Sequence, residues 1–174
     1  MTDKKQPSTS FYGLPYGDIP EETRAKIKAV LQRVGGDATN ARIVGVTGLM
    51  TRFKTPAYAD GGAKILYVDA QQAAAWGEAI WAHEAGHIIL GHTEKIIGNY
   101  LNQGNYAALK GLERDADQSA VEAGYGFALA DKFKEARSKG LGHKPQHPRL
   151  TTRIHDVTEA AVKHNLPHAH PKPP

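Results

Sequence analysis

The stretch Trp81–His92, WAHEAGHIILGH, places three histidines and a glutamate in a run of apolar and small residues. His83 and His87 are four residues apart, so on a helix they lie one turn apart on the same face. Both imidazoles can then reach one metal ion at about 2.0–2.1 Å. Glu84 points off the ligand axis, where its carboxylate can take a proton from a metal-bound water. The apolar flanks predict a buried helix, in which imidazole and carboxylate groups need a partner such as a metal ion.

The third histidine of this stretch, His92, is predicted not to be a ligand. If the helix continues, His92 lies roughly 140° around it from His87 and roughly 180° from His83. Only an abrupt break at Gly91 would return His92 to the ligand face. The completing ligand is therefore expected from another part of the chain.

Residues 112–120, LERDADQSA, supply that ligand on a second predicted helix. Glu113 and Asp117 are four residues apart and share a helix face. Glu113 can ligate zinc, and Asp117 can accept the free ring N–H of a ligating histidine, which fixes its tautomer. Two histidines and one glutamate leave the fourth position of a tetrahedral ion open for water, as a catalytic site requires. Taken alone, this stretch is typical of a charged, solvated helix face, and Asp115 is interpreted as a surface residue.

The composition is that of a globular chain of one domain. It has 174 residues, 40% of them hydrophobic, and a formal net charge of +4 that is spread along the sequence. Nucleic-acid binding is therefore not expected. The absence of cysteine excludes disulfides and thiolate metal sites, so a metal must use His, Asp or Glu. We see no secretory segment and no apolar run long enough to span a membrane, which predicts a cytoplasmic protein.

The pattern along the chain predicts an α+β fold, a helix-rich domain with a small β-sheet, and the H-E-x-x-H arrangement of residues 83–87 makes the domain zincin-like. Apolar periodicity and turn residues predict helices over about 21–34, 73–90 (with a break at Gly77), 106–123, 127–139 and 149–164. Strands are predicted at 41–47 and 64–68, and a loop at 98–105. Residues 1–19 are expected to form a flexible arm, 20–165 a single metallopeptidase domain, and 166–174 a disordered tail rich in His and Pro.

Four separated segments resemble one family of metallopeptidases. They are GGAKILYV (61–68), HEAGHIILGH (83–92), ERDADQSAVEAGY (113–125) and HPRLTTRI (147–154). Together they resemble the gluzincins of the HtpX and CAAX-prenyl-protease type over roughly residues 40–155. Those proteins carry membrane helices and this chain has none in its pattern, so the resemblance is to the compact soluble minigluzincins. ImmA-like regulatory peptidases are the second choice, because their helix-turn-helix module and their usual ending are not seen.

The resemblance implies zinc on His83, His87 and Glu113, with Glu84 as general base and acid. It also implies that His147 lies near the zinc, where it stabilises the oxyanion or acts as a latch, and that Arg153 supports the loop of His147. From the residues alone, His147 is equally well a loop histidine beside a proline.

The predicted function is zinc-dependent cleavage of peptide bonds in a peptide or unfolded protein. The strand just before the active helix, formed by Lys64, Ile65, Leu66, Tyr67 and Val68, is expected to receive the substrate backbone as an additional strand. Two alternatives stay open. One is an ImmA-like peptidase that cleaves a repressor, and the other is a latent or non-catalytic binding module stabilised by zinc. The sequence does not indicate the oligomeric state.

Overall fold

The structure, a computed structural model, describes residues 10–141 and 147–165. Its strands are β1 Ser10–Phe11, β2 Leu14–Pro15, β3 Arg42–Val46, β4 Ala57–Asp60 and β5 Ile65–Asp69. Its helices are α1 Glu21–Val34, the 3-10 helix η1 Gly36–Asn40, α2 Leu49–Phe53, α3 Ala73–Trp76, α4 Glu78–Ile89, α5 Glu94–Asn102, α6 Tyr106–Glu122, α7 Gly126–Ser138 and α8 Leu150–Asn165. The predicted α+β class, rich in helix with small sheets, is confirmed.

The larger sheet has three strands in the order β3-β5-β4. β3 runs parallel to β5, and β4 runs antiparallel to it. The turn between β4 and β5 is held by Asp60, whose Oδ1 accepts hydrogen bonds from the backbone N–H groups of Gly62 and Ala63, both at 2.9 Å. β5 therefore lies in the centre with both backbone edges paired, and β4 is an edge strand. The four-residue β4 was not predicted from the sequence.

The N-terminal segment is ordered where it is described. β1 and β2 form a short hairpin, and the backbone N–H of Gly17 donates to the carbonyl of Gly45 in β3. The ring of Phe11 is buried and lies 4.2 Å from that of Tyr67. Because burial of an aromatic ring stabilises the fold, the predicted flexible arm is wrong for residues 10–19. Residues 1–9 and the predicted tail 166–174 lie outside the described residues.

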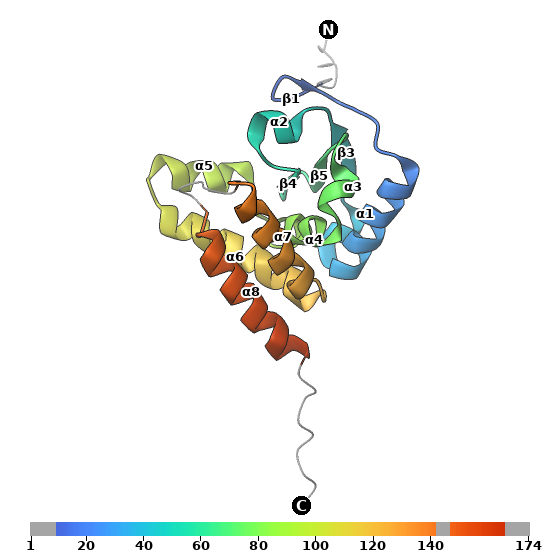
Figure 1. The fold of residues 1–174 in the computed structure, drawn as a ribbon. Helices are drawn as coiled ribbons and strands as arrows, with labels where there is room; N and C mark the ends of the chain where they lie inside the picture. The colour runs from blue at the N-terminus through green and yellow to red at the C-terminus, as the bar shows by residue number, and fades with distance from the viewer. Residues whose placement is uncertain (1–9, 142–146, 166–174) are drawn as a thin grey trace, which may run out of the picture.

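Helix α4 is the central element of the molecule. It packs against α1 and β4 on one side and against α6 and α7 on the other (Figure 1). The predicted break at Gly77 is present, because this residue has φ +74° and separates α3 from α4. Nearly all residues of α4 are buried, from Ala79 to Ile88. The motif of the opening stretch therefore lies in the interior, as its apolar flanks predict.

One predicted loop contains a helix. Instead of irregular structure over 98–105, helix α5 extends to Asn102 before a short turn. Its N-terminus is capped by Thr93, whose hydroxyl accepts a hydrogen bond from the backbone N–H of Ile96 at 3.2 Å. A threonine followed by Glu94 and by apolar residues at helical spacing is the signal that identifies this helix in the sequence.

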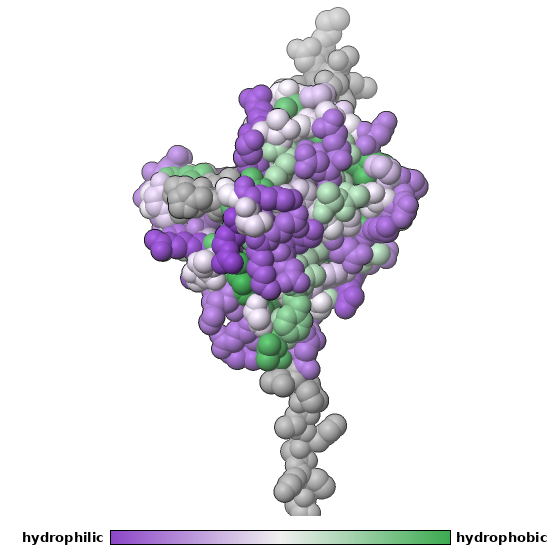
Figure 2. Space-filling view, in the orientation of Figure 1, coloured by the Kyte–Doolittle hydropathy of each residue, from purple (hydrophilic) through white to green (hydrophobic). Residues whose placement is uncertain are grey.

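The outer face drawn in Figure 2 is mostly hydrophilic, with apolar side chains in small patches. The apolar residues are concentrated in the interior around α1, α4, α6 and α7. Over residues 10–141 and 147–165, no helix combines the length and the apolar character needed to cross a bilayer.

Candidate metal centre

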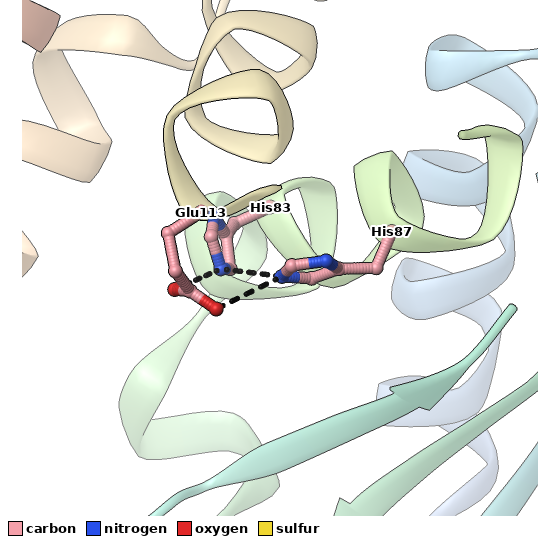
Figure 3. A group of neighbouring side chains, drawn as sticks. All are labelled: His83, His87 and Glu113. Carbon is pink, nitrogen blue, oxygen red and sulfur yellow. Dashed lines mark hydrogen bonds and ion pairs between the residues drawn. The ribbon is translucent and has the colours of Figure 1, made fainter. Parts of the chain in front are cut away.

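Three side chains converge in the interior between α4 and α6. They are His83 and His87 of α4 and Glu113 of α6 (Figure 3). The Nε2 atoms of the two histidines are 3.3 Å apart, and the Glu113 oxygens lie 3.6 Å from Nε2 of His83 and 3.5 Å from Nε2 of His87. In a tetrahedral zinc site with bonds of about 2.0–2.1 Å, neighbouring donor atoms are separated by about 3.3–3.5 Å. The spacing of this group therefore allows it to hold a metal ion.

The two histidines have opposite proton affinities in the metal-free protein. Burial lowers the pKa of His83, but hydrogen bonds to Asp117 and Glu113 outweigh that effect and raise the pKa to about 10. Burial lowers the pKa of His87 to about 3. The pKa of Glu113 lies well below its usual value, because His83, His87, His147 and Arg153 together outweigh the cost of its burial. The centre thus holds a carboxylate facing one charged and one neutral imidazole.

Asp117 holds the second nitrogen of His83. Its Oδ1 lies 2.8 Å from Nδ1 of His83, so Nε2 is directed toward Glu113. This is the contact that the spacing of Glu113 and Asp117 predicts. Carboxylate partners of this kind orient a ligating imidazole and fix its tautomer.

Arg153 of α8 is bound to the two carboxylates of α6. Its Nε and Nη2 donate to Asp117 at 2.8 and 2.6 Å, and its Nη1 lies 3.4 Å from Oε2 of Glu113. Its guanidinium carbon also lies 4.1 Å from the ring centroid of Phe133. These contacts bring α8 to the centre. The predicted support of the His147 loop by Arg153 stays a prediction.

His92 does not lie on the far side of α4, as a continuous helix would place it. Helix α4 ends at Ile89, and Gly91 has φ +65°. The chain then turns back, so Nδ1 of His92 lies 2.8 Å from Nδ1 of His87. His92 contacts a ligand residue without being a member of the group of three. The geometric prediction was wrong about its position because it assumed that the helix continues.

His147 lies at the edge of the centre, just before α8. Its Nδ1 is 3.3 Å from Oε2 of Glu113, and its side chain is 29% exposed. This places it beside a ligand residue, although it does not belong to the group of three. Its predicted oxyanion or latch role stays a prediction.

Glu84 lies beside the group, partly exposed to a cleft. Burial raises the pKa of Glu84 to about 7, and the charge of Glu113 contributes in the same direction. The charge of His83 and a hydrogen bond from the backbone of Ala59 act in the opposite direction. A carboxyl group with a pKa near neutrality can both accept and release a proton at physiological pH.

The cleft has a volume of about 300 Å³ and is lined by the three residues of the group and by Glu84. Residues Ala57–Ala59 of β4 line part of it. Apolar side chains form much of the rest, among them Trp76, Ile80, Ile97, Leu109, Leu112 and Phe133. Ile97 lies on α5, the helix that was predicted as a loop, so the unpredicted elements β4 and α5 both contribute to this cleft.

The predicted substrate strand is corrected by the sheet order. Residues Lys64, Ile65, Leu66, Tyr67 and Val68 are not among the residues that line the cleft. Ile65–Val68 lie in β5, whose two edges are paired with β3 and β4, so no further strand can be added there. The strand that borders the cleft is β4, whose alternating short sequence AYAD gave too weak a period to be recognised.

Comparisons of the chain with protein-family models, with curated proteins and with solved structures found no match. The argument about function therefore rests on the geometry and chemistry of the centre.

Proposed function

We propose that this protein is a zinc-dependent peptidase that cleaves peptide bonds in an extended peptide or an unfolded protein segment. The observation that carries the proposal is the position of Glu84. Its carboxyl group, with a pKa near 7, lies beside the His83, His87 and Glu113 group inside a cleft bordered by an edge strand.

Zinc is the metal that fits these donors best. Two imidazole nitrogens and one carboxylate are a common catalytic zinc set, and three protein ligands leave one position for water. When bound, zinc lowers the pKa of its water and polarises a carbonyl group. His83, His87 and Glu113 would hold the ion, and Asp117 would orient His83 through its Nδ1.

Glu84 performs the proton transfers. As the carboxylate it accepts a proton from the attacking water, and as the carboxylic acid it donates that proton to the leaving nitrogen. A pKa of about 7 suits both steps, since neither protonation state is costly at neutral pH. His147, beside Glu113, is the candidate for stabilising the oxyanion or for covering the centre as a latch.

The substrate backbone pairs with β4. Among the described strands, β4 pairs with β5 alone, and its residues Ala57–Ala59 face the cleft. An extended peptide can add to such an edge through main-chain hydrogen bonds. The apolar walls then accept hydrophobic side chains of the substrate. The resemblance to HtpX and CAAX-prenyl-protease type gluzincins, or secondarily to ImmA-like peptidases that cleave a repressor, supports the same reaction class.

A second candidate function is a zinc-stabilised binding module without catalysis. The observation that favours it is the connection between three helices at the centre. α4 and α6 supply the ligand group, and Arg153 joins α8 to both carboxylates of α6. A metal ion at this junction would stabilise the fold whether or not the protein catalyses a reaction.

The test compares three proteins: wild type, Glu84→Gln, and Glu78→Gln as a control on an exposed residue of the same helix. Zinc content is measured by atomic absorption, and cleavage of unfolded casein by gel electrophoresis. We expect all three to bind zinc and Glu84→Gln alone to lose cleavage, by about 10²-fold or more.

Other outcomes decide between the two functions. If Glu84→Gln cleaves as fast as wild type, Glu84 is not the base. If wild type holds zinc, cleaves no member of a peptide library and unfolds when zinc is removed, the binding module is favoured. Unchanged zinc content in His83→Ala and in Glu113→Ala would exclude the metal centre itself.

A further inference from the structure

Each histidine of the metal group has a partner on its second ring nitrogen. His83 faces the carboxylate of Asp117, and His87 faces the imidazole of His92, both at 2.8 Å. His92 is buried, with 6% of its surface exposed. The two ligand histidines are therefore held by different chemical groups.

Metal binding by Nε2 of His87 would fix which nitrogens of His87 and His92 carry a proton. Nε2 of His87 faces the metal group, so it must offer a lone pair to bind an ion. A neutral imidazole has one ring proton, which must then lie on Nδ1 of His87. That N–H points at Nδ1 of His92. His92 can accept it only when its own ring proton is on Nε2.

The fold holds His92 in this place from both sides. Its backbone N–H donates to the carbonyl of His87 at 3.0 Å, and its carbonyl accepts from the N–H of Gly61 at 3.3 Å. A β-carbon on Gly61 would lie 2.7–2.8 Å from the backbone of His87 and His92, so only glycine allows this approach. The left-handed Gly91 completes the turn. The β4–β5 turn and the end of α4 thus jointly fix the position of His92.

We propose that His92 is a positioning residue, which accepts the Nδ1 proton of His87 and so presents Nε2 of His87 to the metal ion. The inference rests on the metal centre of the proposed function. Partners of this kind increase metal affinity, because a ligating imidazole that is free to rotate or to change tautomer binds the metal less tightly. His92 thus strengthens metal binding without touching the metal.

The test uses the full chain with His92→Leu and His92→Asn. Oδ1 of asparagine is bonded to Cγ, as is Nδ1 of histidine, so it offers an acceptor at the same place, whereas leucine offers none. His155→Leu, at an exposed position of α8, is the control. The zinc dissociation constant is measured by competition with a chelating dye. We expect His92→Leu to weaken zinc binding by about 10–100-fold and His92→Asn to restore most of that loss.

Folding and tautomer are measured separately. Circular dichroism of the metal-free variants shows whether each is folded, and ¹⁵N chemical shifts of the zinc-loaded wild type report the protonation of each ring nitrogen. An unprotonated Nδ1 on His92 supports the inference, and a protonated one overturns it. Equal zinc affinity in wild type and His92→Leu, or equal loss in both variants, also overturns it. If wild type itself binds no zinc, the metal centre fails; if wild type binds zinc and His92→Leu binds equally, the role of His92 alone fails.

Discussion

Gly86 of α4 lies directly against the backbone of Ala116 of α6. A β-carbon built on Gly86 would be 2.9 Å from both Cα and the carbonyl oxygen of Ala116. The absence of a side chain lets the two helices approach closely where the histidines of α4 face the carboxylates of α6. The spacing of the ligand group therefore depends on a glycine that holds no metal itself.

Gly86→Ala is expected to destabilise the protein by about 1–3 kcal/mol, because α4 and α6 must move apart to admit the methyl group. Zinc affinity should decrease with it, since the donors of the two helices separate. Urea unfolding and dye competition measure both effects. Gly111→Ala is the matched control in α6, where a β-carbon meets nothing within 4 Å. That control should be neutral or stabilising by up to about 1 kcal/mol, and equal behaviour of both variants would contradict the close-contact argument.

Asp117→Asn is expected to cost about 3–5 kcal/mol of unfolding free energy, because it leaves the buried guanidinium of Arg153 without its main charge partner. The side chains are only 6% and 7% exposed, so water does not replace the lost interaction. Urea unfolding of the metal-free protein measures the loss. Glu22→Gln, which breaks an exposed pair with Lys26, should leave the unfolding curve unchanged. A comparably small effect for both variants would show that the Arg153 contacts are not stabilising.

Zinc binding is expected to release about one proton at pH 8, because His83 is charged in the metal-free protein and must be neutral to ligate. His87 is already neutral, and Glu84 is mostly ionised at this pH. Calorimetric titrations in buffers with different ionisation enthalpies give the number of protons. In Asp117→Asn the pKa of His83 should fall and fewer protons should be released. Zinc binding without proton release in wild type would show that His83 is not the charged imidazole.

The metal-free protein is expected to be most stable between about pH 4.5 and 6.5. The pKa of His83 is raised from 6.5 to about 10, so its contribution is fully present below pH 6.5 and is lost as the pH rises to about 10. The pKa of His87 is lowered from 6.5 to about 3, so its contribution is lost as the pH falls from 6.5 to about 3. The pKa of Glu84 is raised from 4.5 to about 7, so its contribution is lost as the pH rises over that range and offsets the gain from His87. Thermal melting in a chelator over this range measures both slopes. Zinc-loaded protein, in which both rings are neutral ligands, should lack the decrease above pH 7, and a parallel decrease would contradict the prediction.

The local part of the centre could be predicted from the sequence. The interval of four between His83 and His87, and again between Glu113 and Asp117, defines one face on each helix. The apolar flanks of the first pair indicated burial. Such intervals depend on the 3.6-residue repeat of a helix, which is a local property.

The surroundings of the centre were predicted less well. The edge strand β4 has four residues, too few for a clear period, and strand order depends on pairing between distant segments. This is why the substrate was predicted to pair with β5. In the structure both edges of β5 are already paired, so a substrate strand cannot be added there. The packed residues 10–19 were missed for a similar reason, since their order depends on contacts with distant residues such as Tyr67, which lies against Phe11. Helix α5 was missed although its cap at Thr93 is a local signal.

The sequence by itself determined the donors of this protein, because the chemistry of His83, His87, Glu113 and Glu84 and their helical spacing are properties of the chain. The supporting role of Asp117 also follows from its spacing to Glu113, but the tertiary structure alone decided the other groups that support the donors. The end of α4 at Gly91 brings His92 to His87, and the packing of α8 brings Arg153 to Asp117. The first contact depends on a change of chain direction at Gly91, and the second joins residues that are 36 positions apart. Neither follows from a local periodicity of the sequence.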